Sequence, residues 1–399
     1  MGNYLGSVGL GENIGYFYSV QGLVSIFMPT LFGILADRKI EAQRLLGLSH
    51  LASGLLMFSV CGVCMASENV TFESIFPLYA LAVAFYMPTL GLANSVSYTA
   101  MQGSGLDKVN DFPRIRIFGT IGFLVAMWFV DLVGFQHSPL QFLVSGVWSI
   151  ALGLYAFSMP HCPVSTATEG QSLRQRMGLD AFKLMKTPRM FLFFVFSMML
   201  GMALQITNGY ASPFIDSFGK LPEFKDVFFV NHANLLISLS QISETLCILL
   251  IPFFLKRYGI KVVMLISMMA WFLRFGFFGV GSPAFPGIIA LILSMIVYGV
   301  AFDFFNISGS LFVDGEVEPS MRSSAQGLFM LMTNGLGAAI GTLAAQAVVN
   351  HFVYSQADAA LQMDGWRTSW LIFSAYSLIV GIVFAVVFKG GKPQAAKAE

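Results

Sequence analysis

Long apolar stretches recur along the chain, and short polar loops separate them. A helix of about 20 predominantly apolar residues spans the hydrocarbon core of a bilayer, and about eleven stretches meet this criterion. They are residues 14–35, 45–66, 76–98, 115–133 and 141–159 in the first half, and 190–213, 230–255, 262–280, 286–311, 325–350 and 368–388 in the second. Their length, without alternation of apolar and polar positions, predicts helices rather than strands.

The composition of the chain supports a membrane protein. Of the 399 residues, 56% are hydrophobic and only 11% are charged, whereas soluble domains carry about 25% charged residues. So few charges cannot cover the surface of a water-soluble particle of this size. The net charge of +1 provides no field that would attract nucleic acid. We therefore predict an all-α polytopic membrane protein with no nucleic-acid partner.

Lys and Arg gather in every second loop, and cytoplasmic loops carry such an excess. The basic loops include 36–44, 99–114 and 256–261, and Lys389, Lys392 and Lys397 lie in the tail. We therefore expect these loops and the C-terminus to be cytoplasmic.

The longest polar segment divides the spans into five and six. We predict an N-terminal helical bundle over 1–159, a cytoplasmic linker over 160–189, and a C-terminal bundle over 190–399 that ends in a short cytoplasmic tail. Tyr86 and Asn94 in the third span have the same spacing as Tyr298 and Asn306 in the ninth. Two equivalent helical halves are typical of transporters built from repeats. Two halves of six helices each would require one more helix before residue 14.

Polar side chains inside the apolar stretches are the candidates for function, because a charge at the bilayer centre costs about 2.5–3.5 kcal/mol. Glu244 and Asp303 are carboxylates in mid-span. Around them the sequence offers a guanidinium, amides, a hydroxyl and rings that lie on helix faces at spacings of three or four residues. The set is Arg116, Thr120, Phe123, Gln205, Asn208, Gln241, Glu244, Phe302, Asp303 and Asn306.

Structural roles remain open for the same residues. Glu244 and Asp303 can be ion-pair partners of Arg116 or Arg274, and Arg116 can extend to the cytoplasmic surface. The amides Gln205, Asn208 and Gln241 can join helices by hydrogen bonds. For Arg274, inside an apolar stretch, the structural role is the stronger hypothesis.

Two glycine patterns predict close contacts between helices. Gly33 opens the loop that contains Asp37 and Arg38, and we expect it to let two helices approach closely while Asp37 caps or pairs at the helix end. Gly337 and Gly341 form a small-residue face for packing. Cys61 and Cys64 lie in an apolar helix without a second cysteine pair or a nearby histidine, so we expect packing residues and no metal site.

Several stretches resemble the bacterial nucleoside:proton symporters of the major facilitator superfamily. The loop 33–39 (GILADRK) is similar to the superfamily's signature loop. The more specific stretches are 84–92 (AFYMPTLGL), 111–123 (DFPRIRIFGTIGF), 204–208 (LQITN), 240–246 (SQISETL) and 301–310 (AFDFFNISGS). The resemblance runs from about residue 2 to about residue 390. The signature loop follows the second helix in the superfamily, so the family's first helix is missing here, and we expect a start codon placed too late.

The resemblance implies two six-helix bundles around a central nucleoside site, and it implies no cofactor. By motif position, the ligands of sugar and base include Arg116, Thr120, Phe123, Gln205, Asn208, Gln241, Glu244, Phe302 and Asp303. Amides can read base edges, carboxylates can accept hydrogen bonds from ribose hydroxyls, and a ring can stack on the base. Asp303 or Glu244 is then the proton carrier, and the sequence does not choose between them.

Other functions remain open beside nucleoside uptake at the bacterial inner membrane. A symporter of sugars or other polyhydroxyl compounds, or a facilitative nucleoside carrier, would use the same fold and the same side chains. An enzyme is disfavoured because the spans contain no H-E-x-x-H or G-x-S-x-G motif. A receptor would need a sizeable soluble domain or a long signalling tail. We expect a monomer whose partners are the nucleoside, the proton and the lipid bilayer.

Overall fold

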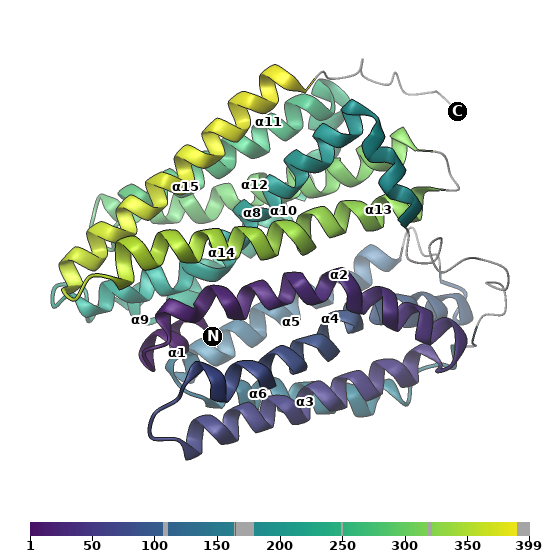
Figure 1. Ribbon diagram of the computed structural model, residues 1–399, viewed down its shortest axis with the longest axis horizontal. Helices are drawn as coiled ribbons and strands as arrows, with labels where there is room; N and C mark the ends of the chain where they lie inside the picture. Colours follow the sequence, from purple (N-terminus) through teal and green to yellow (C-terminus); the bar gives the residue numbers. More distant parts are fainter. Residues whose placement is uncertain (107–110, 163, 165–178, 249, 318–320, 389–399) are drawn as a thin grey trace. The chain divides into compact units, whose positions relative to one another are not determined.

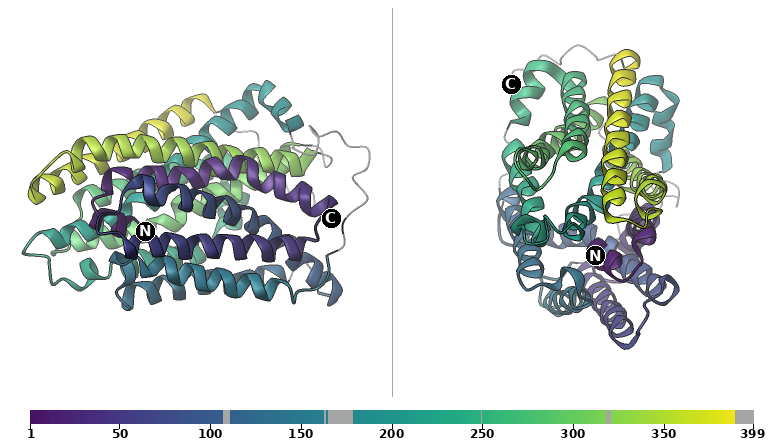
Figure 2. Two further views of the ribbon diagram at one scale, coloured as in Figure 1. Left: turned by 60° about the horizontal axis from the view of Figure 1, so that its bottom comes forward. Right: turned by 90° about the vertical axis from the view of Figure 1, so that its left-hand side faces the viewer.

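The computed structural model describes residues 1–106, 111–162, 164, 179–248, 250–317 and 321–388, and for some of these, among them Asp37, Arg38 and Arg116, only the backbone. The chain forms two compact units, Met1–Leu179 and Asp180–Glu399. Each unit is a bundle of long helices, which lie lengthwise beside one another within their own unit (Figures 1 and 2).

The described residues of unit 1 form five long helices and several short ones. A short helix α1 (Gly2–Ser7) and a turn η1 (Gly11–Asn13) lead into α2 (Ile14–Arg38). The remaining elements are α3 (Ala42–Ala66), α4 (Phe72–Gly103), α5 (Phe112–Leu132), η2 (Phe135–His137) and α6 (Leu140–Ala156). Helix α3 packs against both α4 and α6, and α2 packs against α4.

Reciprocal glycine pairs bring α3 and α6 into close contact. A Cβ atom added to Gly54 would lie 3.0 Å from the Gly146 carbonyl oxygen, and one added to Gly146 would lie 3.0 Å from the Gly54 oxygen. Beside this contact the Ser149 hydroxyl donates to the His50 carbonyl oxygen over 2.9 Å, and the His50 Nδ1 lies 3.2 Å from the same hydroxyl. In lipid no hydrophobic effect drives two helices together, so they associate by close packing, which small residues such as glycine allow.

Unit 2 contains the remaining long helices. It begins with η3 (Leu179–Lys186), α8 (Pro188–Ser217), η4 (Phe218–Lys220), α9 (Phe228–Asn231), α10 (Ala233–Ile248) and α11 (Ile251–Val280). It continues with α12 (Gly287–Glu316), α13 (Arg322–Met330), the π-helical turn η6 (Leu331–Gly337), α14 (Ala338–Val349), a second π-helical turn η7 (Asn350–Tyr354) and α15 (Ala359–Val387). Helix α11 packs on α12 and α15, α10 on α12, and α8 on η6 and α14.

The predicted packing face of Gly337 and Gly341 is confirmed. A Cβ atom added to Gly337 would lie 2.6 Å from the Met198 carbonyl oxygen, and one on Gly341 would lie 2.5 Å from the Met202 Cα atom. Both contacts are made with α8, so α14 and η6 approach the backbone of α8 where larger side chains would separate them.

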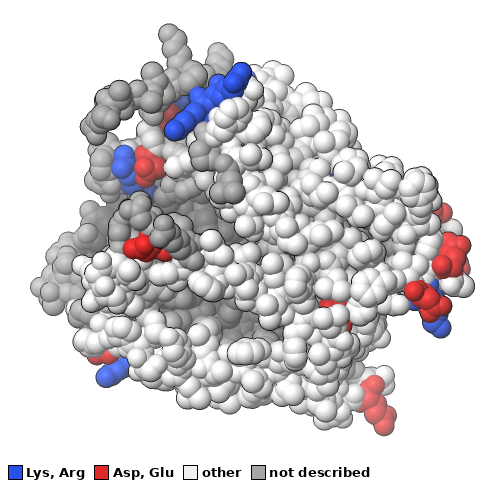
Figure 3. All heavy atoms as spheres, turned by 180° about the vertical axis from the view of Figure 1, so that it is seen from behind, with Lys and Arg blue, Asp and Glu red and all other residues white. Residues whose placement is uncertain are grey.

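The helices correspond to the eleven predicted stretches. Eight helices in the described part of the chain are long and apolar enough to cross a membrane, and three shorter apolar helices lie at Ile117–Leu132, Leu140–Ala156 and Ala233–Ile248. Each predicted stretch overlaps at least one of these helices. Leu23, Phe27, Leu55 and Val386 are among the many large apolar side chains left exposed, as expected for surfaces that face lipid. Most charged side chains in Figure 3 lie near the margins of the face that it shows.

The predicted span 230–255 is interrupted. Helix α10 ends at Ile248, and a new helical segment begins at Ile251 with Pro252 in its first turn. The basic segment 256–261 contains non-helical backbone at Gly259, where φ is 72° and ψ is 173°, so two helical segments meet there within Ile251–Val280. This break agrees with the loop predicted between the stretches 230–255 and 262–280. Proline fits the first helical turn and glycine adopts positive φ readily.

Candidate functional site

Six of the nine predicted binding residues lie in unit 2, on three helices that contact one another. Gln205 and Asn208 belong to α8, Gln241 and Glu244 to α10, and Phe302 and Asp303 to α12. Helix α10 packs along α12, and both helices contact α8. The fold therefore brings together the three helices that carry these predicted pairs, which are far apart in sequence.

Gly299 sets the distance between α10 and α12 at the two carboxylates. A Cβ atom added to Gly299 would lie 2.5 Å from the Ser243 carbonyl oxygen and 2.7 Å from the Glu244 backbone nitrogen. The Ser243 hydroxyl also donates a hydrogen bond to the Ile296 carbonyl oxygen. Because Asp303 follows Gly299 by about one helical turn, this contact places the backbone of Glu244 beside the helix that carries Asp303.

Asp303 is buried in unit 2, with 3% of its surface exposed. Its carboxyl group interacts electrostatically with Glu244, and its Oδ2 atom has no hydrogen-bond partner among the described residues. A buried polar atom without a partner is unusual and points to a functional role or to a partner that comes and goes. The hydrogen bonds of Arg274 go to other residues, and an ion pair of Asp303 with Arg116 stays a prediction because the Arg116 side chain lies outside the described part of the chain.

An aromatic pair lies on the same helix. The rings of Tyr298 and Phe302 stack with centroids 5.9 Å apart and an interplanar angle of 19°, and Trp271 meets Tyr298 edge-on at 6.0 Å. Tyr298 is buried, while Phe302 is half-buried. Sequence reasoning used Tyr298 only for its spacing, and its place between Trp271 and Phe302 became clear only in the structure.

The amides on α8 and α10 have intermediate or full exposure within unit 2. Gln205, Gln241 and the Glu244 carboxylate are half-buried, and Asn208 is exposed. Thr207, between Gln205 and Asn208, is buried. The polar side chains of α8 therefore point in different directions, and Thr207 points into the core of the unit.

Arg274 in α11 is the cation within this core, with 2% of its surface exposed. Its Nε donates to the Thr207 hydroxyl over 3.0 Å, and its Nη1 donates to the Ser294 carbonyl oxygen over 2.6 Å and to the Ser240 hydroxyl over 3.4 Å. The guanidinium carbon lies 4.5 Å from the centroid of the Tyr298 ring. We call Arg274, Thr207, Ser240, Ser294 and Tyr298 the Arg274 cluster.

The three predicted site residues of unit 1 lie on α5. Thr120 is half-buried, and 54% of the surface of Phe123 is exposed in the structure. The side chain of Arg116 lies outside the described part, so its predicted role and its alternatives stay predictions.

The loop after α2 is described only in part. A Cβ atom on Gly33 would meet no atom of the described residues within 4 Å, and the expected close approach of two helices at Gly33 stays a prediction. The side chains of Asp37 and Arg38 lie outside the described part of the chain.

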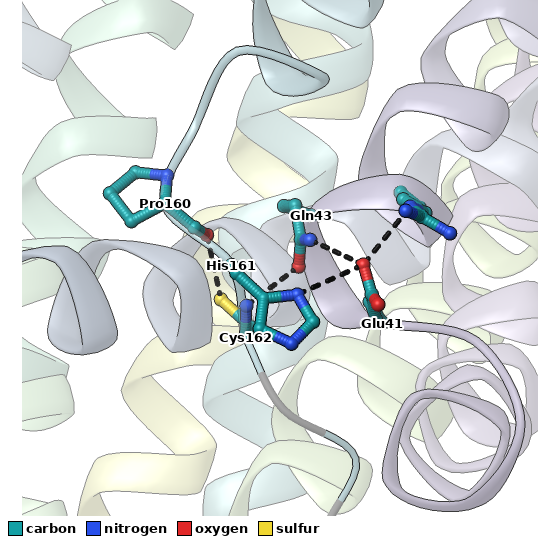
Figure 4. Close-up of polar contacts among 6 residues, drawn as sticks. Glu41, Gln43, Pro160, His161 and Cys162 are labelled. Carbon is teal, nitrogen blue, oxygen red and sulfur yellow. Dashed lines mark hydrogen bonds and ion pairs between the residues drawn. The ribbon is translucent and has the colours of Figure 1, made fainter.

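A second polar cluster lies at one end of unit 1 (Figure 4). The Glu41 carboxylate accepts a hydrogen bond from the Gln43 amide over 2.7 Å and pairs with Arg44 over 3.0 Å, and the Nδ1 atom of His161 lies 3.2 Å from the same carboxylate oxygen. The Gln43 Oε1 atom accepts from the Cys162 backbone N–H over 3.0 Å. This Glu41 cluster joins the start of α3 to the segment that follows α6.

Comparison with known proteins identifies the family. The family model described as "Nucleoside H+ symporter" matches residues 1–392. The chain belongs to the nucleoside H+ symporter family.

Curated relatives in this family are close. The chain is 47% identical over 379 residues to the nucleoside permease NupG of Escherichia coli (strain K12), covering 95% of this chain and 88% of that protein. It is 47% identical over 384 residues to the xanthosine permease of the same organism, with the same coverages. The putative nucleoside transporter YegT of that organism is 30% identical over 385 residues.

Solved structures place the chain in the major facilitator fold. Two crystal structures of the nucleoside transporter NupG match with TM-scores of 0.90 and 0.87 at 46% identity, and they cover 97% and 98% of this chain and 95% of each matched chain. The Escherichia coli xylose transporter XylE matches with a TM-score of 0.60 at 13% identity, covering 98% of this chain and 90% of the matched chain, and this likeness shows the fold alone.

These findings confirm the resemblance to nucleoside:proton symporters and the predicted fold class, an all-α membrane protein with the major facilitator fold. The chain is a multi-pass membrane protein, and the relatives it matches are permeases and transporters. Sequence reasoning missed the contacts of Tyr298 and Arg274. The signal for Arg274 was present, because an arginine within an apolar stretch needs partners, but its partners lie on three other helices.

Proposed function

We propose that this protein carries nucleosides across the bacterial inner membrane together with protons. The observation that carries the proposal is the buried carboxyl group of Asp303, one oxygen of which has no hydrogen-bond partner among the described residues, beside Glu244 and the stacked rings of Tyr298 and Phe302. Membership in the nucleoside H+ symporter family and 47% identity to two permeases support it.

The side chains suit the chemistry of a nucleoside. The half-buried amides of Gln205 and Gln241 can donate to and accept from the edge of a base, and the carboxylates can accept from ribose hydroxyls. The half-buried ring of Phe302 offers a face on which a base can stack. We propose that these residues bind the nucleoside together with Asn208, Glu244 and Asp303 in unit 2, and with Arg116, Thr120 and Phe123 in unit 1.

Proton coupling needs a group that changes its protonation as the carrier moves. Carboxyl groups inside spans commonly serve in proton relays, and Glu244 and Asp303 are the two predicted carboxylates in the middle of the stretches that form α10 and α12. We propose that one of them carries the proton. Alternating access then follows from a rocking movement of the predicted bundles 1–159 and 190–399 about the bound nucleoside.

The predicted orientation has support within unit 2. Arg189 at the start of α8 pairs with Glu316 at the end of α12 over 3.1 Å, and Arg322 at the start of α13 pairs with Asp314 over 3.5 Å. Three segments that the distribution of Lys and Arg assigns to one side of the membrane therefore meet at one end of the unit. We propose that this end, the linker 160–189 and the C-terminus are cytoplasmic, and that the carrier works as a monomer.

Uptake in cells that lack their own nucleoside carriers tests the proposal. We expect the wild-type protein to accumulate radiolabelled uridine or adenosine, and an uncoupler that collapses the proton gradient to abolish the accumulation. Uptake that equilibrates and ignores the uncoupler would indicate a facilitative carrier. No nucleoside uptake by well-expressed, inserted protein, with uptake of a sugar instead, would overturn the proposal.

Variants of the two carboxyl groups test the coupling. We expect Asp303→Asn, Glu244→Gln or both to lose all uncoupler-sensitive accumulation. Glu316→Gln is the matched control, because Glu316 is an acid on the same helix as Asp303 but lies at its end, paired with Arg189. Unchanged coupling in both site variants would exclude both residues as proton carriers.

A further inference from the structure

Arg274 contacts each of the three helices that carry the predicted binding residues of unit 2. Its hydrogen bonds reach Thr207 on α8 and Ser240 on α10, and on α12 it bonds to Ser294 and lies over Tyr298. Arg274 itself belongs to a fourth helix, α11. One guanidinium group therefore links four helices through a single set of directed contacts.

The contacts of Arg274 lie next to the binding residues in the sequence of each helix. Thr207 stands between Gln205 and Asn208, and Ser240 directly precedes Gln241. On α12 the Tyr298 ring beneath the guanidinium stacks on Phe302, which precedes Asp303. A shift of Arg274 would therefore move the backbone or the ring beside every predicted ligand in unit 2.

The chemistry of arginine explains why this position needs it. A guanidinium is a rigid plane with donors in fixed directions, so its partners are held at fixed positions, whereas a lysine ammonium lies on a flexible stem. The oxygen atoms that accept hydrogen bonds from Arg274 belong to hydroxyls and a backbone carbonyl. A buried charge is costly, and a stable bundle of apolar helices can be built without it, so its presence calls for a role beyond packing.

We propose that Arg274 is a positioning residue for nucleoside binding. It acts through Thr207, Ser240 and Tyr298 to hold the side chains of α8, α10 and α12 in the geometry that the substrate needs, without touching the substrate. This inference rests on the proposed nucleoside transport. A merely structural arginine would change how much carrier folds and leave the affinity of each folded carrier unaltered.

The test measures KM and maximal rate of uridine uptake per folded carrier for variants of the cluster. The variants are Arg274→Lys, Arg274→Met and Thr207→Val, the last of which removes one acceptor and keeps the shape of the side chain. Ser197→Ala on α8 is the matched control, because the buried Ser197 hydroxyl donates to Phe193 in its own helix over 2.7 Å. Ser374→Ala is the second control, because its hydroxyl joins α15 to the Phe272 carbonyl oxygen on α11 over 2.8 Å. Fluorescence size-exclusion chromatography gives the amount of folded protein.

We expect Thr207→Val to raise KM about threefold and Arg274→Lys about tenfold. Each variant loses hydrogen bonds of a charged group, and only part of the lost free energy weakens substrate binding, because Arg274 does not touch the substrate. Arg274→Met should raise KM more than Arg274→Lys, and both controls should stay within twofold of the wild type. If KM per folded carrier is unchanged in Thr207→Val and Arg274→Lys while folded protein decreases, Arg274 is structural and the inference fails alone. If the wild-type protein takes up no nucleoside, the proposed function fails, and this inference fails with it.

Discussion

The Glu41 cluster and the Arg274 cluster differ in solvent exposure and in the charge of their partners. In the Glu41 cluster of unit 1, one carboxylate contacts three side chains, and the Arg44 and His161 side chains are 65% exposed. In the Arg274 cluster of unit 2, one guanidinium that is 2% exposed donates to neutral oxygens and lies against aromatic rings. The first cluster joins opposite charges at the end of a helix. The second holds a charge inside the span region with neutral partners.

The difference shows how the surroundings of a charge decide its partners. Exposed opposite charges gain little from pairing, since water and salt already screen them. Inside the spans each donor must find an acceptor within the protein, because lipid supplies none. The Arg274 cluster should therefore tolerate change far less than the exposed members of the Glu41 cluster, and only Gln43, which is 4% exposed, should behave like a core residue.

Charge reversal at the two arginines should produce the largest contrast. In Arg274→Glu, a carboxylate would face the Ser294 carbonyl oxygen on the helix that also carries Asp303, and breaking a buried charged contact costs about 3–5 kcal/mol. We expect almost no folded Arg274→Glu protein in membranes. Arg44→Glu should accumulate at nearly the wild-type level, as measured by fluorescence size-exclusion chromatography. Equal yields of the two variants would contradict the comparison.

Removal of the buried amide in the Glu41 cluster should have an intermediate effect. In the wild-type protein the Cys162 backbone N–H donates to Gln43 Oε1. Gln43→Met removes this acceptor. An unpaired buried donor costs about 1–3 kcal/mol, so the midpoint of thermal unfolding should decrease measurably in detergent. Gln102→Met, at an exposed glutamine of α4, is the control and should leave the midpoint unchanged. A midpoint equal to that of the wild type for Gln43→Met would show that water replaces the amide.

The smallest effect should come from the exposed pair of Glu41 and Arg44. Arg44→Ala removes a contact between residues three apart with the arginine 65% exposed, and such pairs contribute about 0–1 kcal/mol. We expect a small decrease in the unfolding midpoint at low salt that disappears in about 1 M salt, where the Debye length is about 3 Å. The higher KM of Arg274→Lys should persist in the same salt. A salt-independent effect of Arg44→Ala would mean that its apolar stem matters more than its charge.

Much of the fold followed from the sequence by itself. The apolar stretches predicted the helices, because a segment with so few charges and this length has one stable form in lipid. Glu244 and Asp303 were recognised by the cost of placing carboxylates among apolar residues, and the packing face of Gly337 and Gly341 by its small-residue spacing. Each of these predictions depends only on a single residue or segment and on whether lipid or water surrounds it. Local sequence is sufficient for that.

Contacts between helices were decided only by the tertiary structure. Hydropathy did not indicate the interruption between Ile248 and Ile251, which divides the predicted span 230–255 into two helical segments. The role of Gly299 and the partners of Arg274 depend on which helices pack together and at what rotation. Hydropathy shows that a helix crosses the membrane, but apolar faces of similar composition can pack in many ways. The choice among them is made by contacts between residues far apart in the sequence.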